Sequence, residues 1–256
     1  MTDTTHQPTP PPIEIIEQLT AYRAQIDGLS TGDTLRWAAR TFGKNAALAT
    51  SLGAEDQVLT DLIARVAPQL GVFTLDTGRL FPESYDLIAE TTKLYGLPID
   101  IYFPEASAVE TLVREHGVNL FRDSVELRKA CCRIRKLEPL ARALSTKAAW
   151  ITGLRHEQSP TRTDFEVIEF DAVHGIYKIN PLLAWSESDV WDYVSKHGVP
   201  THALHTQNYP SIGCACCTRA VEPGEDVRAG RWWWETPDQK ECGLHVVDGK
   251  LVRRSD

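Results

Sequence analysis

The sequence predicts an α/β fold with a parallel, twisted sheet that carries helices on both faces. Short apolar runs alternate with amphipathic stretches of about 10–15 residues, which is typical of parallel strands joined by crossover helices. The chain has 256 residues, of which 42% are hydrophobic, enough for one substantial core. Its seven Trp, seven Tyr and seven Phe favour a packed globule over a disordered chain.

The predicted elements follow in chain order. Amphipathic helices are expected over 13–26 and 31–42, with Ser30 or Thr31 capping the second. The alternation then gives strands at 46–50, 72–75, 99–103 and 148–152, separated by helices at 57–66, 82–95, 109–116 and 125–144. A strand pair at 165–170 and 176–179 and a helix at 187–197, capped by Ser186, complete the pattern.

The organisation predicted from composition has three parts. Residues 1–12 are polar and Pro-rich and are expected to be disordered; residues 13–225 form a single α/β domain; residues 226–256 form a flexible C-terminal tail. No apolar stretch reaches the roughly 20 residues that span a bilayer, and the N-terminus lacks a signal-peptide core, so a cytoplasmic protein is expected. The net charge of −8 argues against nucleic-acid or membrane binding.

Small, polar or basic residues follow three predicted strands. They are Ser51-Leu52-Gly53, Asp76-Thr77-Gly78 and Gly153-Leu154-Arg155. In open α/β sheets ligands bind at the carboxyl ends of the strands, so these turns predict a nucleotide site, with ordinary strand-to-helix turns as the alternative. The sequence lacks the phosphate-loop and dinucleotide motifs G-x-x-x-x-G-K-[ST] and G-x-G-x-x-G, which disfavours those sites. Guanidinium groups suited to phosphate or sulfate are offered by Arg155, Arg162, Arg228 and Arg231.

Six cysteines give the strongest chemical signal, because a reducing cytosol disfavours structural disulfides. Cys131-Cys132 lies in a helical pattern, whereas Cys214, Cys216 and Cys217 lie in a loop and offer more than one choice of pair. Four thiolates favour an iron–sulfur cluster or zinc. Adjacent helical side chains diverge, which suits the separated irons of a cluster better than one zinc ion. Lys136, one turn beyond Cys132, is the best candidate for a cation that tunes the cluster.

Cys242 stands apart, in Glu241-Cys242-Gly243-Leu244-His245. A lone cysteine is usually inert, but this one lies in a polar, Gly-containing tail. His245 could lower the pKa of the Cys242 thiol or hydrogen-bond a bound oxyanion. The local sequence therefore makes Cys242 and His245 candidate catalytic residues.

Six ordered motifs from about Leu35 to His245 together resemble the assimilatory sulfonucleotide reductases, the adenylyl-sulfate and phosphoadenylyl-sulfate reductases. The motifs are S-x-G-A-E-D at 51–56, L-D-T-G-R-L at 75–80, C-C-x-x-x-K at 131–136, G-L-R-x-x-Q-S-P-x-R at 153–162, C-x-x-C-T-R at 214–219 and E-C-G-L-H at 241–245.

The resemblance implies an adenine-nucleotide-hydrolase-like fold related to ATP pyrophosphatases. It implies that Cys242 attacks the substrate sulfur to give S-sulfocysteine, and that thioredoxin or a glutaredoxin-like dithiol then releases sulfite. Members with both cysteine pairs carry one 4Fe–4S cluster and prefer adenylyl sulfate, which makes the four expected ligands Cys131, Cys132, Cys214 and Cys217. It also places Arg228 and Arg231 at the substrate end.

Three alternatives remain open at this point: a phosphoadenylyl-sulfate reductase, an ATP-dependent tRNA-modifying enzyme with the same sheet, and a non-catalytic iron–sulfur sensor. A tRNA-modifying enzyme of this kind requires a complete Ser-Gly-Gly-x-Asp-Ser loop and a basic surface, and the sequence predicts neither. Cys216 is either a bystander or a source of side reactivity. The sequence leaves open whether the chain forms a homo-oligomer.

Overall fold

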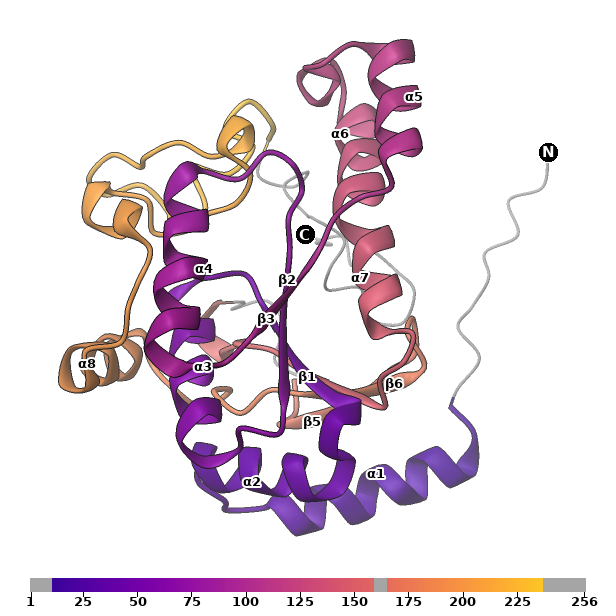
Figure 1. Ribbon diagram of the computed structural model, residues 1–256, viewed down its shortest axis with the longest axis vertical. Helices are drawn as coiled ribbons and strands as arrows, with labels where there is room; N and C mark the ends of the chain where they lie inside the picture. The colour runs from indigo at the N-terminus through magenta and orange to yellow at the C-terminus, as the bar shows by residue number, and fades with distance from the viewer. Residues whose placement is uncertain (1–10, 159–164, 237–256) are drawn as a thin grey trace.

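The fold was analysed in a computed structural model that describes residues 11–158 and 165–236. The described residues form one six-stranded sheet with the strand order β3-β2-β1-β4-β6-β5 (Figure 1). The strands are β1 Ala46–Thr50, β2 Gly71–Leu75, β3 Ile99–Tyr102, β4 Ala149–Ile151, β5 Ile168–Asp171 and β6 Ile176–Ile179. The predicted α/β fold with a parallel sheet is confirmed, with β5 as an antiparallel edge strand.

The central strand β1 reads Ala-Ala-Leu-Ala-Thr, and small apolar side chains suit a strand that is covered on both faces. In register, Leu48 lies opposite Val72 of β2 on one side and Ile151 of β4 on the other. All three side chains are buried. Because the strand order reverses direction at β1, the crevice between the carboxyl ends of β1 and β4 is the expected ligand position.

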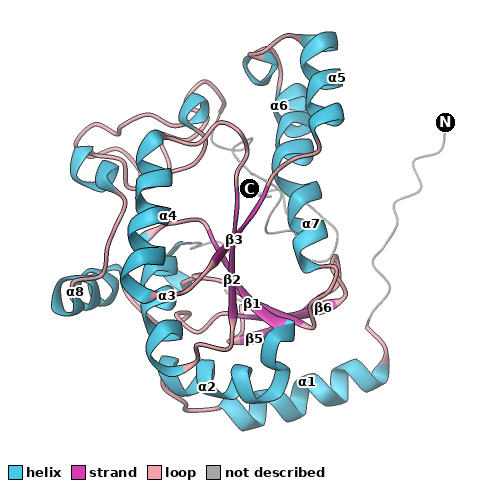
Figure 2. Cartoon of the chain, in the orientation of Figure 1, coloured by secondary structure: helices cyan, strands magenta, loops and turns pink. Residues whose placement is uncertain are grey.

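Helices cover both faces of the sheet, as Figures 1 and 2 show. Helices α2, α3 and α8 pack with the sheet in the larger apolar core, whereas α7 contributes Leu140 and Leu144 to a smaller core on Phe73 and Trp150. The helices are α1 Ile13–Ile26, α2 Thr31–Phe42, α3 Ala54–Val66, α4 Pro82–Tyr95, α5 Ala106–His116, α6 Val125–Cys132, α7 Glu138–Leu144 and α8 Glu187–His197. None of the described helices is long and apolar enough to cross a membrane.

Side-chain caps fix the starts of two helices. The Ser30 hydroxyl accepts a hydrogen bond from the Asp33 backbone N–H, so Ser30 rather than Thr31 caps α2. Ser186 and Asp189 form a reciprocal capping box at the start of α8, as Ser186 predicted. Elsewhere the boundaries shift by up to three residues: α3 and α5 begin earlier than predicted, and β5 begins at Ile168 rather than at residue 165.

The segment predicted as one helix over 125–144 is three joined pieces, because a π-helix over Arg133–Leu137 separates α6 from α7. The physical reason lies in Pro139, which has no N–H to donate to the carbonyl four residues earlier, at Arg135. A wider turn accommodates that missing bond. The wide turn begins directly after Cys132 and therefore sets the position of the cysteine pair.

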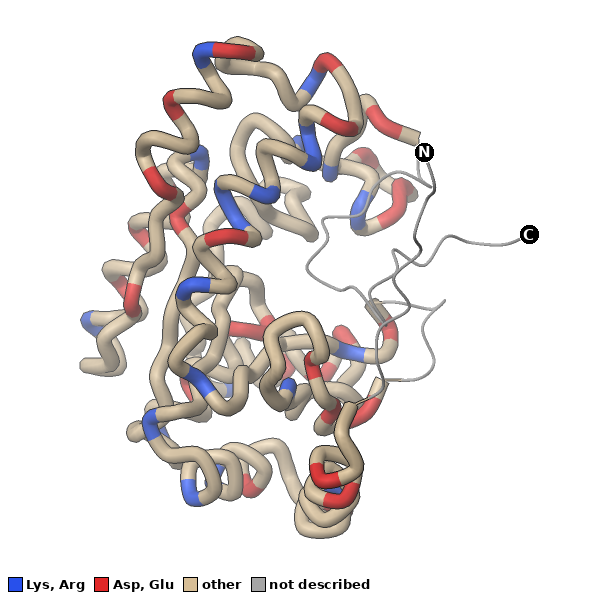
Figure 3. The backbone as a smooth tube through the Cα atoms, turned by 90° about the vertical axis from the view of Figure 1, so that its right-hand side faces the viewer, with Lys and Arg blue, Asp and Glu red and all other residues tan. Residues whose placement is uncertain are grey.

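Basic and acidic residues are interspersed along the described chain (Figure 3). This mixture fits the composition, in which Asp and Glu outnumber Lys and Arg to give a net charge of −8. Local positive charge comes from individual side chains near the strand ends and the cysteines, such as Arg155 and Arg135.

Candidate active site and cysteine group

The turn after β1 is held by a buried carboxylate. The Ser51 backbone N–H and hydroxyl both donate to Asp56 Oδ2, at 2.6 and 2.7 Å. Burial raises the pKa of Asp56 to about 6, and the hydrogen bonds from Ser51 oppose that rise. Gly53 caps α3 immediately after this turn. The motif at 51–56 thus supplies an ordered turn in which Asp56 organises Ser51.

Leu52 occupies this turn in a left-handed conformation, with φ of 66°. Such a conformation is unfavourable for a branched side chain by roughly 1 kcal/mol or more. Two interactions offset it: the Leu52 N–H donates to Thr50 Oγ1 at 3.0 Å, and the side chain is buried against Leu87 and Ile88 of α4. The apolar residue inside the predicted nucleotide loop is therefore a core residue.

The turn after β4 packs directly on the start of α3. A Cβ placed on Gly153 would lie 2.5 Å from Asp56 Oδ1 and 2.8 Å from Glu55 Cβ. Both approaches are shorter than any ordinary contact, so glycine is required here for close packing. The ends of β1 and β4 are therefore in contact through Gly153.

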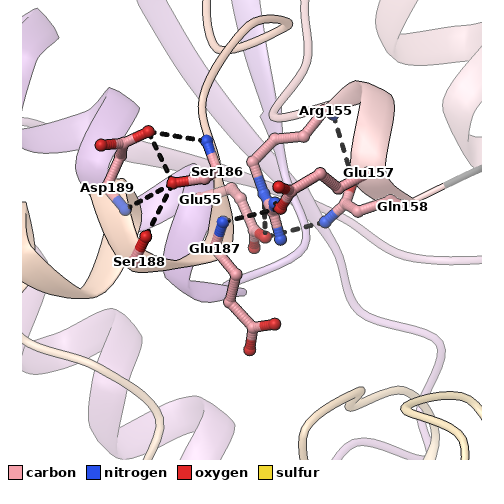
Figure 4. A network of polar contacts seen from close by, with 8 residues as sticks. All are labelled: Glu55, Arg155, Glu157, Gln158, Ser186, Glu187, Ser188 and Asp189. Atoms are coloured by element: carbon pink, nitrogen blue, oxygen red, sulfur yellow. Dashed lines mark hydrogen bonds and ion pairs between the residues drawn. The ribbon is translucent and has the colours of Figure 1, made fainter.

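Arg155 lies at the predicted strand end, but its guanidinium is bonded to two carboxylates (Figure 4). Nε donates to Glu55 at 2.9 Å and Nη1 donates to Glu157 at 2.8 Å, and the Arg155 side chain is only 6% exposed. Gln158 also donates to Glu55, and the Glu187 backbone N–H donates to Glu157 at the start of α8. Arg155 therefore ties together α3, the β4 turn and α8.

The turn after β2 joins the strand ends to the cysteines. Asp76 accepts hydrogen bonds from the Gly78 N–H at 2.7 Å and from the Tyr85 hydroxyl at 3.0 Å. Thr77 Oγ1 lies 3.2 Å from Cys214 Sγ, and Arg135 Nη1 donates to the Thr77 carbonyl at 2.7 Å. Thr77 thus contacts both a cysteine and the π-helix that follows the other cysteine pair.

The two predicted cysteine pairs converge, although 81 residues lie between Cys132 and Cys214 in the sequence. Five thiols gather in one apolar cluster: Cys131 and Cys217 are buried, and three others pack against them. All five are free of disulfide bonds. We call these five thiols the cysteine group. The apolar side chains around it include Leu112, Leu120, Phe121, Ile134 and Trp232.

Two of the thiols, Cys131 and Cys132, are kept protonated by burial, whereas the hydrogen bond with Cys217 lowers the pKa of Cys216 to about 6. Burial raises the pKa of Cys131 and raises that of Cys132 to about 11, although Lys136 and Arg128 oppose the rise at Cys132. Neutral thiols are therefore favoured at Cys131 and Cys132 at pH 7 until a cation compensates the thiolate charge. Binding of a soft metal would supply that compensation and release the protons.

The chemistry of the donor set fits an iron–sulfur cluster. Within residues 11–158 and 165–236, no three His, Cys, Asp or Glu side chains surround a point where one metal ion could sit. A four-iron cluster needs only one thiolate per iron, on four separated irons, so convergence on one point is not required. Soft, buried thiols in this number are the chemistry that such a cluster needs.

A buried ion pair fixes the chain that follows the second cysteine pair. Arg128, one turn before Cys131 and Cys132, donates from Nε and Nη2 to Glu235 at 2.9 and 2.8 Å. Its guanidinium also lies 4.6 Å from the ring centre of Trp232, and the Trp232 backbone N–H donates to the Cys217 carbonyl. These contacts hold Trp232 over the cysteine group. The helical spacing of Arg128 from Cys131 and Cys132 indicates in the sequence that it lies near the cysteines. The sequence contains no such indication for Glu235.

The remaining predicted residues lie as follows. Arg228 is exposed, and Arg231 donates from Nη1 to Ser211 Oγ and the Ile212 carbonyl. Lys136 is half-buried in the π-helix. Arg162, Cys242 and His245 lie outside the described residues. A separate cavity of about 800 Å³ is lined by α1, α2 and the 181–185 segment, and it contains none of the predicted site residues.

Residues 45–220 match the sequence profile of the phosphoadenosine phosphosulfate reductase domain family. The chain is 56% identical over 197 residues to the adenosine 5'-phosphosulfate reductase of Allochromatium vinosum, covering 77% of each chain. It is 52% identical over 199 residues to the enzyme of that name from Burkholderia cepacia, covering 78% of this chain and 80% of that one.

Among solved structures, phosphoadenylyl-sulfate reductase from Candida auris in a phosphate complex aligns with a TM-score of 0.66 at 30% identity, over 78% of this chain and 95% of that chain. Yeast FAD synthetase aligns with a TM-score of 0.50 at 16% identity, over 81% of this chain and 74% of that one, which shows a shared fold alone. The resemblance found in the sequence is thereby confirmed, and the chain belongs to the phosphoadenosine phosphosulfate reductase domain family.

Proposed function

We propose that this chain is a thioredoxin-dependent adenylyl-sulfate reductase that converts adenylyl sulfate to sulfite and AMP, in assimilatory sulfate reduction and cysteine biosynthesis. The observation that carries the proposal is the convergence of both cysteine pairs beside Thr77, at the carboxyl edge of the sheet. Support also comes from relatives named adenosine 5'-phosphosulfate reductase at 52–56% identity.

The nucleotide binds at the carboxyl ends of β1, β2 and β4. Ser51 and Gly53, ordered by Asp56, open helix α3, whose first N–H groups favour an anion. Asp76, Thr77 and Gly78 form the neighbouring wall. Positive charge for the phosphosulfate comes from Arg162, Arg228 and Arg231, and from Arg155 if the phosphate replaces one of its carboxylate partners.

The chemical step is a thiolate substitution at sulfur. Cys242 Sγ forms a bond to the sulfate sulfur, and the bond between that sulfur and the bridging oxygen breaks, so AMP leaves with the electron pair. The product is S-sulfocysteine. A dithiol protein, thioredoxin or a glutaredoxin-like protein, then attacks Cys242 Sγ and releases sulfite. Its second thiol resolves the mixed disulfide, which regenerates the Cys242 thiol and leaves the dithiol oxidised by two electrons. His245 assists by stabilising the thiolate or the bound oxyanion.

One 4Fe–4S cluster would be held by Cys131, Cys132, Cys214 and Cys217. When bound, it would supply a fixed, polarisable charge beside Thr77, whereas the two electrons of the reaction come from thiols. Arg135 fixes the Thr77 carbonyl, and Lys136 offsets thiolate charge at Cys132. Arg135 and Lys136 thereby hold the turn at 76–78 in a fixed position relative to the cysteine group.

Phosphoadenylyl sulfate is the second candidate substrate, because the Candida auris relative carries that name at 30% identity. Both cysteine pairs favour adenylyl sulfate by family resemblance. The ratio of kcat/KM for the two substrates decides between them. A higher value for the 3′-phosphorylated substrate would overturn the proposed preference and leave the sulfur chemistry intact.

The direct test is to trap the intermediate. Purified protein with its cluster is mixed with adenylyl sulfate without a reductant, digested, and measured by mass spectrometry. The peptide that contains Cys242 should carry one sulfonate group, which thioredoxin should remove as sulfite. Cys242→Ser should lose the adduct and sulfite production but keep the visible absorbance of the cluster. An adduct on any other cysteine would contradict the assignment of the nucleophile.

A further inference from the structure

Cys216 has no role in the proposed function, yet its sulfur belongs to the same thiol group. Cys216 Sγ lies 3.7 Å from Cys217 Sγ. The Cys216 side chain is half-buried among the apolar side chains that surround the other four cysteines. Cys216 is therefore no isolated surface thiol. Its position bears on which sulfur holds the fourth iron.

The short helical turn Ala215–Cys217 directs both sulfurs to this group. The Cys217 N–H donates to the Cys214 carbonyl at 2.9 Å, and Thr218 Oγ1 donates to the same carbonyl. The Gly213 N–H in turn donates to Thr218 Oγ1 at 3.2 Å. Because the backbone is held on both sides of the turn, the two neighbouring thiols stay close together without a disulfide.

The separation of the two sulfurs is that of two ligands on one metal. Two thiolates on a tetrahedral metal with metal–sulfur bonds of about 2.3 Å lie about 3.8 Å apart. An iron of a 4Fe–4S cluster accepts one protein thiolate, because cluster sulfides fill its other positions. Cys216 and Cys217 can therefore serve the same iron only as alternatives.

We propose that Cys216 and Cys217 are interchangeable ligands for one iron of the cluster, so that the chain holds four irons with five thiols. This inference rests on the cofactor assigned in the proposed function. Cys217, the more buried of the two, is the resident ligand; Cys216 takes the position when Cys217 is absent or modified. Cys214 differs, because the contact that its sulfur makes is with the Thr77 hydroxyl.

The test measures iron, acid-labile sulfide and visible absorbance per folded chain. Four variants are compared with the wild type: Cys217→Ala, Cys216→Ala, the double variant, and Cys214→Ala. Each single variant at 216 or 217 should keep wild-type iron and sulfide, with a shifted absorbance in Cys217→Ala because the ligand geometry changes. The double variant and Cys214→Ala should fall to background.

The outcomes separate this inference from the proposed function. If wild-type protein contains no iron or sulfide, the cofactor assignment fails. If the wild type carries the cluster but Cys217→Ala loses it as completely as Cys214→Ala, only the interchange is refuted.

Should Cys217→Ala not fold, the nearly isosteric Cys217→Ser is measured with and without Cys216→Ala. Retention of the cluster in Cys217→Ser that depends on Cys216 supports the interchange. Retention without Cys216 means that the serine oxygen binds iron, and it refutes the interchange, as does loss of the cluster with Cys216 present.

Discussion

The strand-end turns and the cysteine group share Thr77, but they are stabilised in opposite ways. At the strand ends, charged side chains find partners within the chain: Asp56 is bonded to Ser51, and Arg155 to two carboxylates. In the cysteine group, Cys131 and Cys217 are buried among apolar side chains, and burial raises the pKa of Cys131 and Cys132. The polar groups of the first region are satisfied by the folded chain alone, whereas in the second region Cys131 and Cys132 need a cation before they form thiolates. We therefore expect nucleotide binding to tolerate loss of the cluster.

The largest expected effect comes from removing a thiol of the cysteine group. Cys214→Ala should lose iron and sulfide and abolish sulfite production, because the remaining thiols leave one iron without a ligand. AMP binding should weaken by less than about 1 kcal/mol, or about fivefold in Kd. Iron analysis and calorimetric titration with AMP measure the two effects separately.

Thr77→Val is the matched control, because it removes the hydroxyl that contacts Cys214 and leaves every thiol in place. It should keep its iron. If Cys214→Ala instead weakens AMP binding by more than a hundredfold while the chain stays folded, the two regions are not independent and the comparison fails.

The buried ion pair beside the cysteines gives the next largest effect. Arg128 and Glu235 have side chains only 1% and 3% exposed, so Arg128→Met leaves a carboxylate buried without its partner. We expect the free energy of unfolding to fall by about 3–5 kcal/mol, and Tm by about 10 °C. Differential scanning calorimetry measures both.

Arg219→Met provides the comparison on an exposed pair. Arg219 and Glu225 lie 2.8 Å apart with side chains about one-third exposed, at 34% and 32%. Loss of this pair should cost less than about 1 kcal/mol. Equal effects for Arg128→Met and Arg219→Met would mean that burial does not determine the strength of these pairs.

Asp56 predicts a pH dependence that belongs to the strand-end region. Burial raises the pKa of Asp56 to about 6 in the folded chain, above its ordinary value of 3.8. The folded state therefore binds the proton more tightly than the unfolded state. This contribution to stability is fully present below about pH 4 and is lost as pH rises through about 6, a change of about 3 kcal/mol.

Asp56→Asn isolates that contribution, because the other titrating groups cancel in the difference between wild type and variant. The wild type should lose stability relative to Asp56→Asn between pH 4 and pH 7 in urea unfolding. A difference that is constant over this range would show that the Asp56 carboxyl does not titrate as its burial requires.

Much of the fold could be predicted from the sequence because local periodicity and long-range packing agree. The strand at 46–50 and the helices at 13–26, 31–42, 82–95 and 187–197 were predicted with the bounds that the structure has. The π-helix was missed because helical periodicity continues through it. Its cause, Pro139, is visible in the sequence.

Some features of the candidate site could likewise be predicted from the sequence, whereas others depend on tertiary packing. Spacing and thiol chemistry indicated two groups of cysteines, and the family resemblance selected Cys217 over Cys216. The contact of Thr77 with Cys214 depends instead on how β2 meets a distant loop. Arg155 was expected to present free donors to an anion, but the carboxylates of Glu55 and Glu157 already occupy two of them. Which residue pairs with a given guanidinium is decided by tertiary packing, and a single sequence carries no measure of that.

A smaller effect than those of Arg128 and Asp56 is expected at the backbone contact that joins the ends of β1 and β4. Gly153→Ala places a methyl group 2.5 Å from Asp56 Oδ1, so the β4 turn must move away from α3. Overpacking of this size costs about 1–3 kcal/mol. Because the moved turn belongs to the proposed nucleotide site, AMP binding should weaken by about tenfold, while iron content stays at the wild-type value. Gly32→Ala is the matched control: its new methyl group meets nothing closer than 3.9 Å and lies in helix α2, where alanine is favoured. Gly32→Ala should leave AMP binding unchanged. If Gly153→Ala releases iron as well, the rigid link between the two regions extends beyond Thr77 to the β4 turn.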